Sequence, residues 1–154
     1  MTQGQPETRK GSNMEPKVTF IQPGTIPSLA SVDYPYAANI PAGMDVVFLA
    51  GACPLDQDRT IPEGAGYERQ VKLCVDNIKA VLQESGAALE DLVYTRILVA
   101  ANDRSDLVKV WRTVREELGE HNVPSTLTGV TLLGYEHQLV EIEAVAAVKR
   151  MEKK

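Results

Sequence analysis

The sequence has few of the cysteines and histidines that form disulfides or metal sites in small folds. Its two cysteines, Cys53 and Cys74, lie in separate apolar segments and belong to no C-x-x-C or Cys/His cluster. We interpret them as buried free thiols, which favours a reducing, cytoplasmic location. The two histidines, His121 and His137, lack partner ligands at the spacing of a metal site. We therefore predict neither a metal nor another cofactor.

Long hydrophobic runs and an excess of positive charge are also lacking. The longest apolar run, 46–53, is far below the roughly 20 residues of a membrane helix, and residues 1–16 contain no apolar segment of an export signal. The formal net charge is −5, so the field of the protein repels nucleic acids and anionic membranes. A dinucleotide fingerprint is absent too, because Arg69 stands where the third glycine after Gly64 and Gly66 would be.

What is present fits one ordinary globular domain. With 154 residues, 44% hydrophobic and 24% charged, the chain is long enough to bury a core of its own. Residues 1–16 are polar and aperiodic, so we interpret them as a disordered tail or an extension. The domain is expected over 17–150, followed by a basic tail at 151–154.

Hydrophobic periodicity predicts two helices among several strands. Apolar residues recur every three or four positions from Tyr67 until Gly86 stops the pattern, and again from a cap at Asp103 or Ser105 to Gly119. Alternating or β-branched segments predict strands at 17–21, 37–40, 45–50, 92–100, 126–133 and 139–148, with hairpin turns at 41–43 and 134–137. This order favours an α+β two-layer sandwich, in which both helices cover one face of a mixed or antiparallel sheet.

The last strand carries the most informative pattern. One set of alternating residues, from Val140 to Val148, is entirely apolar, whereas the other set contains Glu141 and Glu143 among apolar neighbours. We expect another subunit of a closed homo-oligomer to cover this second face. Two carboxylates there are candidates for acid–base catalysis, although a solvated edge or a structural hydrogen bond explains them equally well on composition alone.

The position of the hydroxyl groups depends on the turn at 134–137. If it is a four-residue hairpin loop, Thr128 opposes Glu143 and Val130 opposes Glu141, which brings hydroxyls and carboxylates together. A five-residue loop separates them.

Four segments together resemble the Rid/YjgF family of reactive-intermediate deaminases. They are Gly51-x-x-Pro54, the helical stretch 76–82, Pro124, and the closing strand 140–146. The resemblance implies a chorismate-mutase-like fold, a homotrimer whose sheets form a central barrel, and ligand clefts between subunits. It also implies hydrolysis of enamines or imines, such as 2-aminoacrylate, to a keto acid and ammonia.

In that family an arginine, third in a Pro-x-Arg motif, holds the substrate carboxylate, and a glutamate of the last strand positions water or supplies a proton. By this resemblance the catalytic glutamate falls on Glu141 and a binding tyrosine on Tyr36. The arginine position falls on Thr126, so the usual carboxylate clamp is missing and a neutral or larger apolar substrate is expected. Further positions that line the cleft fall on Ala50, Thr128 and Trp111, with Glu143 beside them, although Trp111 also continues the apolar stripe of its helix.

Two functions are consistent with these residues. The first is an enzyme that hydrolyses or tautomerises an imine or enamine with Glu141 and the cleft hydroxyls. The second is a non-catalytic trimer that binds a metabolite or a partner protein in the same clefts. Replacing Glu141 by Gln separates them, since only the enzyme has turnover to lose. The family's ribonuclease activity is not supported by this acidic chain.

Overall fold

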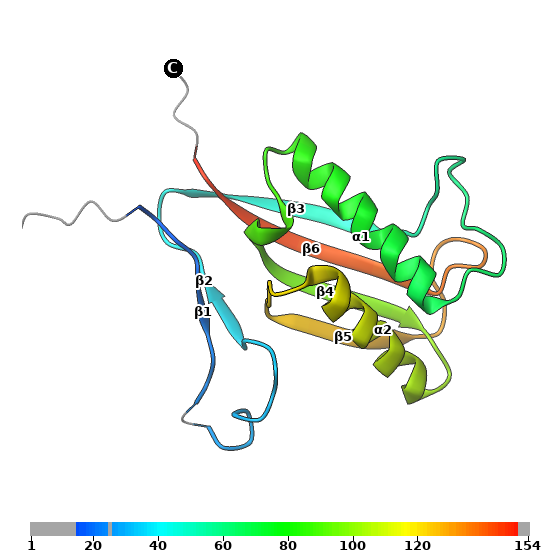
Figure 1. Cartoon of the computed structure of the whole chain (residues 1–154), viewed down its shortest axis with the longest axis horizontal. Helices are drawn as coiled ribbons and strands as arrows, with labels where there is room; N and C mark the ends of the chain where they lie inside the picture. Colours follow the sequence, from blue (N-terminus) through cyan, green and yellow to red (C-terminus); the bar gives the residue numbers. More distant parts are fainter. Residues whose placement is uncertain (1–14, 25, 151–154) are drawn as a thin grey trace, which may run out of the picture.

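The computed structural model describes residues 15–24 and 26–150. The predicted tail at 1–16 lies almost wholly outside this range, and the predicted tail at 151–154 lies wholly outside it. The elements in chain order are β1 (Thr19–Ile21), β2 (Ala37–Asn39), β3 (Met44–Ala52), α1 (Tyr67–Glu84), a short 3-10 turn (Leu89–Asp91), β4 (Leu92–Ala100), α2 (Arg104–Leu118), β5 (Ser125–Val130) and β6 (Val140–Lys149) (Figure 1). Both predicted helices are confirmed within two residues.

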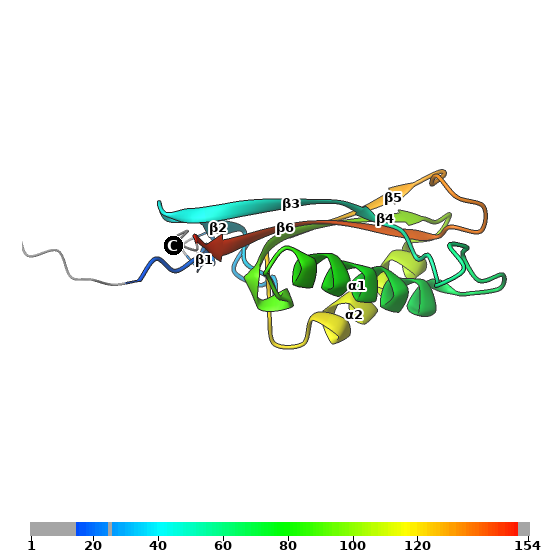
Figure 2. The same ribbon diagram turned by 90° about the horizontal axis from the view of Figure 1, so that it is seen from above.

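The main sheet is four-stranded, in the order β3-β6-β4-β5. Strand β6 is antiparallel to both β3 and β4, whereas β4 and β5 are parallel. Both helices lie on one side of this sheet and leave the other side bare (Figure 2). The predicted α+β layering with a mixed sheet is therefore confirmed. Strands β1 and β2 pair with each other in a separate two-stranded sheet beside it.

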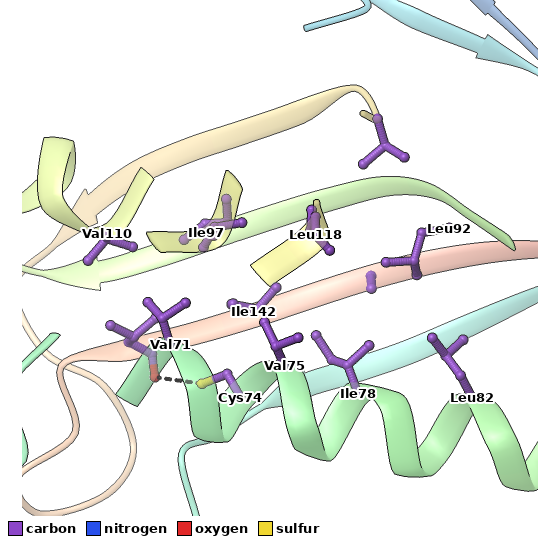
Figure 3. Packing of buried hydrophobic residues seen from close by; sticks show 14 of the residues in the cluster. Val71, Cys74, Val75, Ile78, Leu82, Leu92, Ile97, Val110, Leu118 and Ile142 are labelled. Carbon is purple, nitrogen blue, oxygen red and sulfur yellow. Dashed lines mark hydrogen bonds between the residues drawn. The ribbon is translucent and has the colours of Figure 1, made fainter. Parts of the chain in front are cut away.

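The core lies between the helices and the covered side of the sheet (Figure 3). Helix α1 contributes Val71, Cys74, Val75, Ile78 and Leu82, which are all at most 2% exposed. The apolar set of β6 faces them, as its alternation predicts. The Cys74 thiol donates to the Val140 carbonyl at 3.8 Å. In the described part of the chain, no helix has the length and apolar character needed to cross a membrane.

Both predicted hairpins are wrong. Strand β3 pairs with β6 instead of β2, and β4 lies between β5 and β6. Helix α2 connects β4 to β5, and a helical crossover returns the chain parallel to the strand it left, which explains the parallel β4–β5 pair. Strand β6 lies on the other side of β4, between β4 and β3, where both of its edges are paired.

This strand order changes the predicted register. Thr128 does not oppose Glu143, and Val130 does not oppose Glu141. Across β5, β4 and β6, one row is Thr126–Arg96–Glu143 and the next is Thr128–Leu98–Glu141. Hydroxyls and carboxylates do share one face, but a β4 residue separates them in each row.

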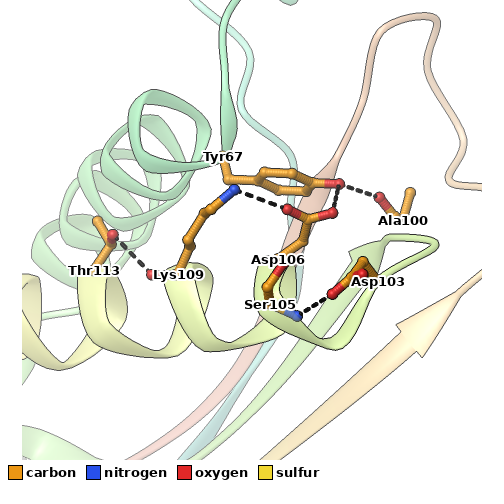
Figure 4. Close-up of polar contacts among 7 residues, drawn as sticks. All are labelled: Tyr67, Ala100, Asp103, Ser105, Asp106, Lys109 and Thr113. Atoms are coloured by element: carbon orange, nitrogen blue, oxygen red, sulfur yellow. Dashed lines mark hydrogen bonds and ion pairs between the residues drawn. The ribbon is translucent and has the colours of Figure 1, made fainter.

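A polar cluster joins the first turns of the two helices (Figure 4). The Tyr67 hydroxyl donates to the Ala100 carbonyl at 2.9 Å and lies 3.4 Å from Asp106, which also pairs with Lys109 at 3.0 Å. Asp103 caps α2 by accepting from the backbone N–H of Ser105 at 2.7 Å. These contacts hold α1 against the end of β4 and so keep the helical layer in place.

Two valines of α2 test the assignment of its buried face. Val110 is fully buried and Val108 is 47% exposed. Val110→Ala is expected to lower the free energy of unfolding by about 2 kcal/mol because it leaves a cavity, whereas Val108→Ala changes it by less than about 0.5 kcal/mol. Urea unfolding measures both, and equal losses would contradict the assigned packing.

Candidate functional site

The face of the sheet that the helices leave bare carries the candidate site. On β3 its side chains are apolar: Val46 is 43% exposed and Phe48 is 79% exposed. On β4 and β6 the same face carries Tyr94, Arg96 and Leu98, and Glu141, Glu143 and Val145. Such a mixture of exposed apolar and paired charged groups is unusual for a face in contact with water alone.

The two carboxylates of this face have different partners. Glu143 pairs with Arg96, whose Nη1 lies 3.4 Å from Oε2, and both side chains are partly exposed. Glu141 contacts no cation among the described residues. Its Oε2 accepts from Nε2 of Gln138 at 3.1 Å and from the thiol of Cys53 at 3.5 Å. Both hydrogen-bond donors of Glu141 are therefore uncharged groups.

A β-bulge places the end of β3 beside Glu141. Leu49 pairs with Ala144 but Ala52 pairs with Ile142, so Ala50 and Gly51 share the space opposite one residue of β6. Both residues line a cavity of about 330 Å³ that also includes Cys53, Asn77 and Tyr135. The Asn77 amide donates to the carbonyls of Cys53 and Leu55 at 2.9 and 3.1 Å, which fixes the chain after the bulge.

A second cavity, of about 380 Å³, lies at the other edge of the sheet. Its lining includes Tyr36 and Thr126 together with Tyr34 and Tyr94. The Tyr94 hydroxyl donates to Oγ1 of Thr126 at 3.0 Å, so the threonine hydroxyl already has a partner. The rings of Tyr34 and Tyr36 stack with centroids 5.7 Å apart, and burial is the main reason that the pKa of Tyr34 is raised.

Trp111 lies next to this second cavity. It is half-buried, packs against the core and meets Tyr34 edge to face at 5.5 Å. With Tyr34, Ser125 and Leu127 it lines a smaller pocket of about 270 Å³. Trp111 thus packs against the core and also lines this small pocket, while its place in a ligand cleft stays a prediction.

The structure divides the sequence-predicted residues into two groups. Tyr36, Thr126 and Trp111 gather at the β5 edge, while Ala50 lies at the β3 edge with Glu141 on the neighbouring strand. Thr128 shares the face of Glu141, but Leu98 lies between them in the register. One chain therefore does not bring all the predicted residues into one cavity.

Several neighbours of these residues were not predicted. Tyr94 and Arg96 follow from alternation on β4, once β4 is known to lie between β5 and β6. Gln138, Gly51 and the Cys53–Glu141 contact depend on the bulge and on the loop before β6, for which the sequence carries no periodic signal.

Both cysteines are free, as expected, but Cys53 is only half-buried. Partial burial raises the pKa of the Cys53 thiol, and the nearby charge of Glu141 and its hydrogen bond with the thiol raise it further. Burial raises the pKa of Cys74 much more strongly. At neutral pH both side chains are thiols, and the Cys53 thiol donates to Glu141.

Comparisons with known proteins agree on one family. A family model described as endoribonuclease L-PSP matches residues 29–148. A RutC family protein of Pyrococcus abyssi is 32% identical over 112 residues, which cover 73% of this chain and 85% of the relative. The 3-aminoacrylate deaminase RutC of Acinetobacter baylyi is 26% identical over 133 residues, which cover 86% of this chain and 99% of that protein.

Solved structures show the same fold. A Rid-family protein of unknown function from Yersinia pestis superposes with a TM-score of 0.73 at 23% identity, over 85% of this chain and 98% of that chain. A YjgF-family protein from Mycobacterium tuberculosis gives a TM-score of 0.57 at 28% identity, over 86% and 100% of the two chains.

The Cys53–Glu141 contact makes a prediction that needs no substrate. Glu141→Gln removes the negative charge, so the pKa of Cys53 falls and its thiolate fraction rises. Near pH 8.5, about the ordinary pKa of a thiol, iodoacetamide is expected to alkylate Cys53 about threefold faster in this variant. Peptide mass spectrometry distinguishes Cys53 from Cys74, which stays unmodified.

Glu143→Gln is the matched control, since Glu143 pairs with Arg96 and not with the thiol. An equal acceleration in both variants, or none in Glu141→Gln, would show that Glu141 does not face Cys53.

Proposed function

This chain belongs to the endoribonuclease L-PSP family, which is also the Rid/YjgF and RutC family, and we propose that it hydrolyses or tautomerises a small imine or enamine. Glu141 is the acid–base group of this reaction. The single observation that carries the proposal is a half-buried carboxylate, with no cationic partner among the described residues, in contact with Cys53, which lines the cavity at the β3 edge. The chain is also related to a 3-aminoacrylate deaminase. That relative is named for acting on an enamine.

The site is completed between protomers of a homotrimer. Strands β3 and β5 are the two edges of the main sheet, and each edge carries one of the two cavities. A head-to-tail ring brings the β5 edge of one protomer against the β3 edge of the next, which joins Tyr36 and Thr126 to Glu141. The exposed Phe48 and Val46 then face the inside of a barrel of three sheets, in a chorismate-mutase-like assembly.

The chemistry needs one group that both gives and takes a proton. An enamine that is protonated on carbon becomes an iminium ion. Water adds to its C=N carbon and loses a proton, which leaves a neutral carbinolamine. The carbinolamine nitrogen then takes a proton and its hydroxyl loses one, so that ammonia departs and a carbonyl remains. In its protonated form Glu141 gives its proton to carbon and takes one from the attacking water. It then passes that proton to the leaving nitrogen and takes the hydroxyl proton of the carbinolamine, so it ends protonated as it began. The hydroxyls of Tyr36, Thr126 and Thr128 orient the substrate.

Thr126 in place of an arginine favours an uncharged substrate. A guanidinium holds a carboxylate through two parallel hydrogen bonds, whereas a threonine hydroxyl supplies neither the charge nor the fork. Arg96 lies on the same face, but it is engaged by Glu143. With Tyr34, Tyr36 and Tyr94 around Thr126, the cavity suits a neutral, partly apolar molecule.

An endoribonuclease activity is not favoured. The chain has a net charge of −5, and the bare face of its sheet carries the carboxylates of Glu141 and Glu143, which repel a phosphate backbone. The alternative that remains is a trimer that binds a metabolite or a partner protein without turnover.

Turnover of two substrates tests the proposal. The wild type is expected to accelerate hydrolysis of a neutral imine more than that of freshly generated 2-aminoacrylate, and Glu141→Gln is expected to lower kcat at least about 100-fold with the ligand still bound. Thr126→Arg is expected to reverse the preference, because it restores a partner for the carboxylate. Ammonia release measures all three.

Two results separate the alternatives. Acceleration that disappears in Glu141→Gln identifies an enzyme with an altered substrate preference. A second outcome is that the wild type accelerates neither reaction but Thr126→Arg gains activity toward 2-aminoacrylate. In that case the fold can support deamination, and the native protein is a binding module.

A further inference from the structure

The two oxygens of the Glu141 carboxylate have different surroundings. Both donors that reach this side chain, Nε2 of Gln138 and Sγ of Cys53, contact Oε2. Among the described residues, none donates a hydrogen bond to Oε1. Resting on the proposed function above, we propose that Gln138 and Cys53 are positioning residues that hold Oε2, and that Oε1 is the oxygen that exchanges the proton with substrate.

Gln138 is itself held in one orientation. Its side chain is 5% exposed, its Oε1 accepts from the backbone N–H of Tyr135 at 3.0 Å, and its Nε2 also donates to the Val140 carbonyl at 3.2 Å. Turning the amide over would place its oxygen against the Val140 carbonyl and the Glu141 carboxylate, so this network determines which end faces Glu141.

The loop that carries Gln138 is anchored to helix α1. Gln70, which is fully buried, donates to the carbonyls of Ala65 and His137 at 3.0 and 2.8 Å. Its Oε1 accepts from the backbone N–H of Leu139 at 2.7 Å. A buried amide with all three partners in place stabilises one loop conformation. Gln70 of α1 therefore holds the loop before β6, and Gln138 of that loop holds Oε2 of Glu141.

Gly51 provides the space for Oε1, the other oxygen of the Glu141 carboxylate. A β-carbon at position 51 would overlap Oε1 of Glu141 and would lie 2.6 Å from Cδ and 2.9 Å from Cγ. Real β-carbons do not approach other heavy atoms so closely, so either the β3 bulge or the carboxylate would have to move. Glycine is needed here for space, because any side chain would displace the oxygen that we assign to proton exchange.

These contacts fix the orientation of the Glu141 carboxylate. Holding Oε2 with two donors leaves one oxygen for chemistry and removes the freedom of the carboxylate to rotate, which lowers the entropic cost of reaching the reactive geometry. Loss of a positioning contact is expected to lower kcat more than it raises KM, because the carboxylate acts on the transition state.

Steady-state kinetics of the full chain test this, with the neutral imine or 2-aminoacrylate, whichever the wild type turns over faster. Gln138→Leu is expected to lower kcat about tenfold with little change in KM. Cys53→Ala is expected to lower kcat about threefold, and Cys53→Ser to recover most of that loss because a hydroxyl still donates. A purely structural role for Cys53 predicts no difference between Ser and Ala.

Gly51→Ala is expected to lower kcat about 100-fold, because a displacement of the carboxylate by about 1 Å is enough for such a loss. Gly129→Ala on β5 is the matched control, since a β-carbon there meets only the methyls of Leu107 at 3.8 Å, an ordinary contact. Circular dichroism and the urea midpoint show that each variant is folded before it is assayed.

The outcomes separate the two proposals. Turnover that requires Glu141 but keeps its full kcat in Gln138→Leu, Cys53→Ala and Gly51→Ala overturns the positioning assignment alone. A wild type without turnover of either substrate overturns the proposed function and this inference with it. Losses of kcat in all three variants, with recovery in Cys53→Ser, support the assignment.

Discussion

The side chains of β6 alternate between two environments, and this alternation connects the core to the candidate site. The set that includes Val140 and Ile142 is buried under the helices, so it determines which way the strand faces. Glu141 and Glu143 must then point to the bare side, because a strand that turned over would bury two carboxylates in an apolar core. The same packing that stabilises the fold thus holds the carboxylates on the face where another protomer is proposed to bind.

Sequence periodicity predicted the elements well because each is decided by short-range pattern. Helix α1 and strands β4 and β6 were found nearly to the residue from their apolar spacing. Strand pairing is decided by contacts over longer distances: the turn at 134–137 suggested a hairpin, but β6 pairs with β3 and β4 and not with β5. Hydroxyls and carboxylates nevertheless share a face, because the alternation in each strand determines which of its residues point to the core and which point to the bare side.

The candidate site was predictable only in part, for the same reason. The resemblance to the family selected Glu141, Tyr36 and Thr126, whose roles stay predictions, and the structure adds their neighbours. The places of Gln138 and Gly51 beside Glu141 were not predicted, because Gln138 lies in a loop and Gly51 in a bulge that inserts an extra residue opposite β6. Neither feature leaves a regular pattern in the sequence. The two cavities lie at opposite edges of the sheet, and the proposed ring of copies would join them.

Complementation between two inactive variants tests the proposed site most directly. Glu141→Gln removes the proposed acid–base group near one edge, and Thr126→Trp fills the cavity at the other. If each site combines the β3 edge of one protomer with the β5 edge of the next, equal coexpression of the two variants gives trimers in which about one quarter of the sites are intact. About one quarter of wild-type turnover is expected from this mixture, and about one hundredth or less from Glu141→Gln alone. A mixture as inactive as its components would contradict the shared site, because a site contained within one chain is never restored by mixing.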